Sequence, residues 1–139
     1  TQSWVSADEM KSRLSSISNE LAPAGATNLE LALDLASDKH SDMSSIYIVT
    51  DGLPTQASAS IRIRNVSNCG ISVRRAIPNV TGECREALFQ DSIKALTMPS
   101  VVVNVVLLPF EGDPMAAPNY WQWVAKTGGR IFSPDRNWP

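Results

Sequence analysis

The sequence has 139 residues, of which 43% are hydrophobic and 19% are charged, and its formal net charge is −2. This length suits one globular domain, and the composition is not that of a disordered chain. The chain carries no excess of positive charge, which argues against binding to nucleic acid or to an acidic membrane surface. The longest apolar run, residues 101–110, is too short to cross a bilayer. No signal peptide is recognisable and the first residue is Thr1, so we expect a fragment or a processed product.

The first part of the chain predicts two helices and a strand. A Ser-x-x-Glu capping box at residues 6–9, followed by apolar residues at helical spacing, predicts a helix over residues 7–21. A second capping box at residues 27–30 predicts a helix that ends near Ser37. Residues 46–50 are mostly β-branched or aromatic, and we expect a strand that is buried on both faces.

The second part begins with residues 53–84, which predict a long irregular insertion. A helix is predicted over residues 85–96, a buried strand over 101–108, a short helix over 119–126 and a final strand over 130–133. Strands that alternate with helices indicate an α/β fold with parallel strand pairing. Five arginines in or beside the insertion are expected to be solvated: Arg62, Arg64, Arg74, Arg75 and Arg85.

Asp51 follows the strand at residues 46–50 directly and is itself followed by Gly52. Ligands of parallel α/β sheets bind beyond the carboxyl ends of the strands, where this carboxylate is expected to lie. The alternative is that Asp51 only caps its own turn, as aspartate often does. On the tripeptide Thr50-Asp51-Gly52 alone, both interpretations stay open. Glu111 or Asp113, in the loop after the next strand, would approach the same crevice.

Three stretches taken in order, APAGATNLELAL, IVTDGLPT and YWQWVAKTGGRIFSP, resemble the von Willebrand factor A family. The resemblance covers nearly the whole chain, as the carboxyl-terminal half or more of one such domain. It implies a three-layer, doubly wound, mostly parallel sheet that here lacks its first strands. It also implies a metal-ion-dependent adhesion site, in which Thr27 and Asp51 bind Mg²⁺ or Mn²⁺. The implied function is protein binding and not catalysis.

The sequence departs from this family at one motif of the metal site. The D-x-S-x-S motif is absent, and the nearest approach, at residues 42–45, has the wrong spacing. Two oxygen ligands hold Mg²⁺ poorly, because this ion prefers a full octahedral shell. The strand at residues 46–50 would also lose a neighbour and present an open edge. We therefore expect another chain or a cleaved segment to complete the domain, or the missing half to lie outside this sequence.

Thr27 has two competing interpretations. As a helix N-cap paired with Glu30 it is explained structurally, and a threonine cap contributes about 1 kcal/mol. The same oxygen cannot serve a cap and a metal equally well. The residues alone favour the cap, whereas the family resemblance assigns Thr27 to the metal in the intact domain.

Cys69 and Cys84 are the only cysteines, and both belong to the irregular insertion. A disulfide between them would constrain this long loop and stabilise the fold by about 3 kcal/mol in the loop-entropy model. It would also indicate a location outside the cytoplasm, whether periplasmic, cell-surface or secreted. The alternative is two unrelated reduced thiols.

Two further functions remain open besides the adhesion module. One is a metal-free scaffold or assembly domain with an incomplete site. The other is a Mg²⁺-dependent α/β hydrolase that uses Asp51. The hydrolase is disfavoured because the sequence contains neither a phosphate-binding G-x-x-x-x-G-K-[ST] loop nor a G-x-S-x-G elbow.

Overall fold

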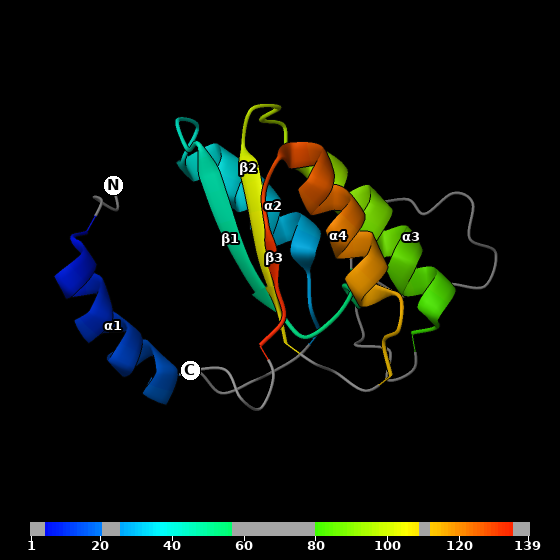
Figure 1. Cartoon of the computed structure of the whole chain (residues 1–139), viewed down its shortest axis with the longest axis horizontal. Coiled ribbons are helices and arrows are strands. Elements are labelled where there is room, and N and C mark those ends of the chain that lie inside the picture. Colours follow the sequence, from blue (N-terminus) through cyan, green and yellow to red (C-terminus); the bar gives the residue numbers. More distant parts are fainter. Residues whose placement is uncertain (1–4, 21–25, 57–79, 109–111, 135–139) are drawn as a thin grey trace.

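The structure is a computed structural model that describes residues 5–20, 26–56, 80–108 and 112–134 (Figure 1). Most of the predicted insertion, residues 57–79 with Cys69, lies outside this description. The elements follow in the order α1 (Ala7–Glu20), α2 (Leu29–Lys39), β1 (Ser45–Thr50), α3 (Gly82–Ser92), the short 3₁₀ helix η1 (Ile93–Ala95), β2 (Val102–Leu107), α4 (Ala116–Thr127) and β3 (Ile131–Phe132).

The three strands form an open parallel sheet in the order β1-β2-β3. Ser45 pairs with Val102 at the start of β1, and Thr50 pairs with Leu107 at its end. The predicted α/β class with parallel pairing is therefore confirmed. β1 has no strand on its other side within the described residues, so the expected open edge is present there.

Helices α2, α3 and α4 cover one face of the sheet. Their buried side chains and the inward side chains of the strands form a single hydrophobic core, centred on Leu33, Phe89, Val103, Val105 and Tyr120. The Phe89 ring meets the rings of Tyr120 and Trp123 edge to face, with centroids 4.8 and 5.8 Å apart. Such contacts between aromatic rings fix the position of α3 relative to α4.

The opposite face of the sheet is largely bare in the described structure. Side chains alternate along a strand, so Tyr47 and Val49 point away from the core, and they are 68% and 66% exposed. Val106 and Phe132 share this face by their register and are half-buried. The prediction that residues 46–50 are buried on both faces is therefore wrong, because no described helix covers the second face.

The amino ends of α2 and α3 differ from the expected positions. Asn28, not Thr27, caps α2, and its side-chain oxygen accepts a hydrogen bond from the Leu31 N–H at 3.0 Å. Thr81 caps α3 by accepting from the Cys84 N–H at 3.3 Å, so the helix begins at Gly82. The predicted insertion over residues 53–84 therefore ends earlier than expected.

The segment from α4 to β3 follows the predictions closely. Gly128 ends α4 in the left-handed conformation (φ 76°), as its position after the helical pattern indicates. Gly129 then lies directly against β2, where a Cβ atom would come within 1.8 Å of the Val103 carbonyl oxygen. Tyr120 and Trp123 are buried, whereas Trp121 is 64% exposed.

Helix α1 lies beyond β1, apart from the other helices (Figure 1). Its predicted cap is confirmed, because the Glu9 N–H donates to the Ser6 hydroxyl at 3.2 Å. Its apolar residues Met10 and Leu14 are 42% and 55% exposed. Each helix in the described part of the chain is too short or too polar to serve as a bilayer-spanning segment.

Candidate functional site

The turn after β1 carries Asp51 at the carboxyl edge of the sheet. The Thr50 hydroxyl donates to the Gly52 carbonyl oxygen at 2.8 Å and accepts from the Gly52 N–H at 3.3 Å. Thr50 therefore performs the local capping that we considered for Asp51. Asp51 is exposed, and within the described residues its carboxylate takes part in no hydrogen bond or ion pair.

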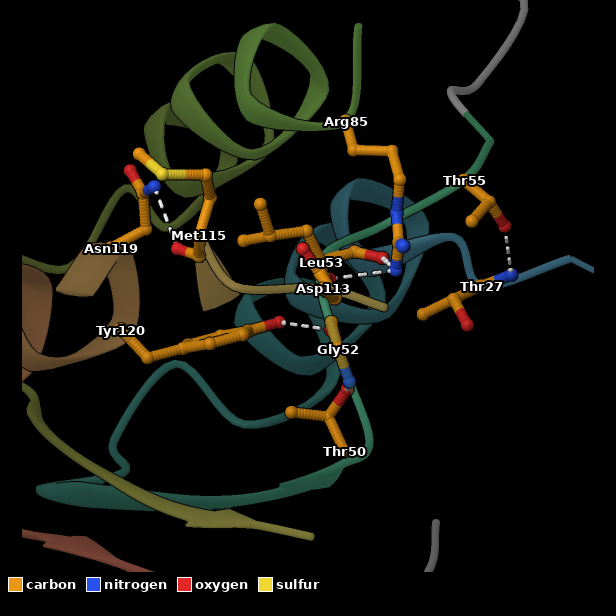
Figure 2. Close-up of polar contacts among 10 residues, drawn as sticks. All are labelled: Thr27, Thr50, Gly52, Leu53, Thr55, Arg85, Asp113, Met115, Asn119 and Tyr120. Atoms are coloured by element: carbon orange, nitrogen blue, oxygen red, sulfur yellow. Dashed lines mark hydrogen bonds and ion pairs between the residues drawn. The ribbon is translucent and has the colours of Figure 1, made fainter. Parts of the chain in front are cut away.

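A buried ion pair holds the next residue of the turn. The Leu53 N–H donates to Asp113 Oδ2 at 2.7 Å, and Arg85 Nη2 donates to the Leu53 carbonyl oxygen at the same distance. Arg85 Nη2 also lies 2.8 Å from Asp113 Oδ2, and the two side chains are only 15% and 2% exposed (Figure 2). The backbone of Leu53 is thus bound on both sides by charged groups, which form stronger hydrogen bonds than neutral ones.

Tyr120 supports the turn from the core. Its hydroxyl donates to the Gly52 carbonyl oxygen at 3.1 Å (Figure 2). Burial raises the pKa of Tyr120 from 10.0 to about 12, because a phenolate would lose its hydration. The nearby charges of Asp113 and Asp51 add to this rise, while the hydrogen bond with Thr50 and the Arg85 charge oppose it. Tyr120 is therefore a neutral donor at physiological pH.

The loop that carries Thr27 is joined to the segment that follows Asp51. The Thr27 N–H donates to the Thr55 hydroxyl at 3.0 Å. In return the Thr27 carbonyl oxygen accepts from the N–H groups of Thr55 and Gln56, at 3.0 and 3.1 Å. Figure 2 shows Thr27 beside Thr55 at the end of this segment. Two loops that are distant in sequence thus meet, and each carries one of the residues that we expect to bind metal.

The donors on these two loops fit a hard cation only in part. A carboxylate and a hydroxyl are the oxygen ligands that Mg²⁺ and Mn²⁺ accept. The Thr27 hydroxyl does not cap α2, since Asn28 does so. No group of three or more His, Cys, Asp or Glu residues suited to a metal occurs in the described ranges. Further oxygen ligands would have to come from water, from residues outside these ranges or from another segment.

Asp113 lies at the Asp51 turn, as we expected for the loop after β2. It is not free to act as a further ligand of a cation. Its carboxylate already bonds to Leu53 and Arg85. Glu111, the other acidic residue of this loop, lies outside the described residues.

Arg85 and Tyr120 are the functional residues that sequence reasoning missed. Arg85 was expected to be solvated with the arginines of the insertion, but its side chain is only 15% exposed and bonds to Leu53 and Asp113. Tyr120 was given no functional role at all. No local pattern reveals either role, because the partners lie 32 and 68 positions away in sequence.

Cys84 lies in the first turn of α3 and is buried, with 2% of its surface exposed. Cys69 is outside the described residues. The disulfide between them therefore stays a prediction.

A separate surface hollow of about 600 Å³ lies along α4 and is lined partly by Met115, Trp121 and Glu86. The buried Asn119 amide borders it, but this amide already bonds to Gln90, Glu86 and the Met115 carbonyl oxygen. The lining of the hollow is mainly apolar.

Comparison of the chain with protein-family models, with curated proteins and with solved structures finds no match. The class that the structure defines is a mixed α/β protein with an open three-stranded parallel sheet. The resemblance to the von Willebrand factor A family thus remains an expectation that depends on the sequence motifs.

Proposed function

We propose that this chain is part of a protein-binding module of the von Willebrand factor A type, with a doubly wound sheet completed by further segments. In this proposal a divalent cation, Mg²⁺ or Mn²⁺, binds at the carboxyl edge of the sheet to Asp51 and Thr27. Oxygen ligands from a second segment and from the protein partner complete its coordination.

The observation that carries the proposal is the state of the Asp51 carboxylate. It is exposed at the carboxyl edge and has no partner among the described residues, while the neighbouring turn is held by Thr50, Tyr120, Arg85 and Asp113. A carboxylate that contributes nothing to its own turn is available to an external ligand. The backbone bonds that join the Thr27 loop to the segment after Asp51 support the choice of Thr27 as the second oxygen ligand.

The test is a Mn²⁺ titration by calorimetry on the chain and on Asp51→Asn, with the mass of each sample checked for a co-purified partner. We expect a dissociation constant on the order of micromolar to millimolar for a site of few ligands, and no measurable binding to Asp51→Asn. Asp42→Asn is the matched control, because Asp42 is exposed and precedes β1 at the opposite edge. Equal binding to wild type and Asp51→Asn, or no binding to any sample, would reject the cation site in this chain.

The bare face of the sheet favours one second candidate, a scaffold domain that assembles without metal. An unpaired strand edge is a site where another chain can add, and Tyr47 and Val49 are exposed on β1, which has no second neighbouring strand among the described residues. If assembly uses this surface, Val49→Lys will reduce the sedimentation coefficient of the assembled species in the absence of any divalent cation. Unchanged sedimentation of the variant would contradict the scaffold candidate.

The predicted disulfide supports placing either kind of module outside the cytoplasm.

A further inference from the structure

The Asp51 turn is held by residues from distant elements. Gly52 and Leu53 together present four backbone polar groups, and every one has a partner: Thr50 for the Gly52 N–H, Thr50 and Tyr120 for its carbonyl oxygen, Asp113 for the Leu53 N–H and Arg85 for its carbonyl oxygen. A turn with this complete set of bonds has one strongly preferred conformation.

We propose that Arg85 and Asp113 are positioning residues for Asp51. They act through the backbone of Leu53 and keep the preceding carboxylate directed to the edge of the sheet. Insofar as Asp51 is a cation ligand, this inference rests on the proposed function. Neither positioning residue touches the cation itself.

The ion pair also sets the charge beneath the site. Arg85 is the one cation bonded to this turn among the described residues, and its side chain is 15% exposed. The Asp113 carboxylate, 2.8 Å away, neutralises the charge of Arg85. The Arg85 charge therefore neither repels a divalent ion at the site nor draws the Asp51 carboxylate away from that ion. Removal of Asp113 alone would leave this charge buried and unpaired, which is costly.

The positioning pair links the site to two helices. Arg85 belongs to the first turn of α3, and Asp113 lies three residues before α4. Figure 2 shows both side chains converging on Leu53 from these two sides. The direction of Asp51 therefore depends on how α3 and α4 pack, and not on the turn sequence alone.

The first experiment measures the turn without metal, by amide hydrogen exchange at Leu53 under native conditions. In Asp113→Ala we expect exchange at Leu53 to be faster by roughly 10- to 100-fold, the loss that fits a hydrogen bond to a charged group. In Asp113→Asn the amide oxygen keeps an acceptor for Leu53, so its exchange should rise by a smaller factor. Amides of β2 serve as the internal reference for global unfolding.

The second experiment measures Mn²⁺ affinity for the same proteins and for Arg85→Lys. A residue that orients a metal ligand typically changes affinity by about 10-fold or more when it is replaced. We expect such weakening in Asp113→Asn and Arg85→Lys. Lys94→Ala is the control, since it removes the exposed Lys94–Asp91 ion pair next to α3 and touches nothing at the turn. Its affinity should equal that of the wild type.

The outcomes separate the two proposals. Unchanged Leu53 exchange in Asp113→Ala, or an equal rise at β2, would overturn the positioning role even if Mn²⁺ binds. A second result would also overturn it: Leu53 loses protection, yet Asp113→Asn and Arg85→Lys bind Mn²⁺ through Asp51 as tightly as the wild type does. Selective loss of Leu53 protection in a protein that binds no Mn²⁺ would support the positioning of the turn and reject the cation site.

Discussion

Gly52 lies against Asp113 with no space for a side chain between them. A Cβ atom on Gly52 would come within 2.7 Å of Asp113 Oδ2 and within 2.8 Å of Arg85 Nη2. The glycine after Asp51 thus permits the close approach of the ion pair to the turn.

We therefore predict that Gly52→Ala destabilises the protein by about 1–3 kcal/mol, as overpacking of a buried site does. The added methyl group must displace the ion pair from Leu53, because both charged groups are too near. Urea denaturation provides the measurement. Gly82→Ala is the matched control, since a Cβ atom there meets nothing within 4 Å, and it should be neutral or slightly stabilising. Equal stability of the two variants would show that the turn accommodates a side chain.

A second prediction separates Asn28 from Thr27. Asn28→Ala should cost about 1 kcal/mol of stability, because it removes the N-cap of α2. Thr27→Ala should change stability by less than about 0.5 kcal/mol, since the bonds of Thr27 to Thr55 and Gln56 use its backbone. Thermal or urea unfolding of both variants decides the question. A larger loss for Thr27→Ala would restore Thr27 as the structural cap.

We predict that the protein loses stability at alkaline pH, because burial raises the pKa of Tyr120. Its pKa is about 12 in the folded protein, against 10.0 ordinarily. Above pH 10 the unfolded chain releases a proton that the folded chain retains, so the free energy of unfolding falls as pH rises toward 12. Because the pKa of Tyr120 is higher by about two in the folded than in the unfolded protein, this loss amounts to roughly 3 kcal/mol.

The measurement is urea unfolding between pH 9 and 12, for wild type and Tyr120→Phe. The variant should lose its hydrogen bond to Gly52 at every pH but lack this part of the alkaline decline. Tyr47→Phe, at the exposed tyrosine, should keep the full decline. An identical decline in wild type and Tyr120→Phe would contradict the role given to burial.

The predicted disulfide can be tested without further structural data. Peptide mapping of unreduced protein should recover one peptide pair that contains Cys69 and Cys84. Reduction should lower stability by about 3 kcal/mol in the loop-entropy model. Alkylation of both thiols in denaturant without reductant would show that no disulfide is present.

The helices and strands could be predicted because their signals are local. Capping at Ser6 and the apolar run that becomes β2 each involve a few consecutive residues, and both are confirmed. The α2 cap was assigned one residue too early, because Thr27 and Asn28 are both good capping residues and sequence alone does not separate them.

The candidate site could be predicted only at its surface. Asp51 was recognisable because it ends a strand, and its position needs no distant partner. The pair beneath it depends on contacts between Leu53, Arg85 and Asp113, which are separated by 32 and 60 positions. The exposure of Tyr47 and Val49 was missed for a related reason: a run of apolar residues indicates burial but does not say whether a second layer is present.

In the described part of the chain, helices α2, α3 and α4 cover only one face of the sheet, so binding to the other face can change the stability of the protein. Any segment that binds the face of Tyr47 and Val49 in the folded state alone must raise the free energy of unfolding. At a concentration 100 times its dissociation constant, such a segment adds about 2.7 kcal/mol. The melting temperature of the isolated chain then rises with the concentration of an added segment that binds this face, and this rise is a direct assay for such binding.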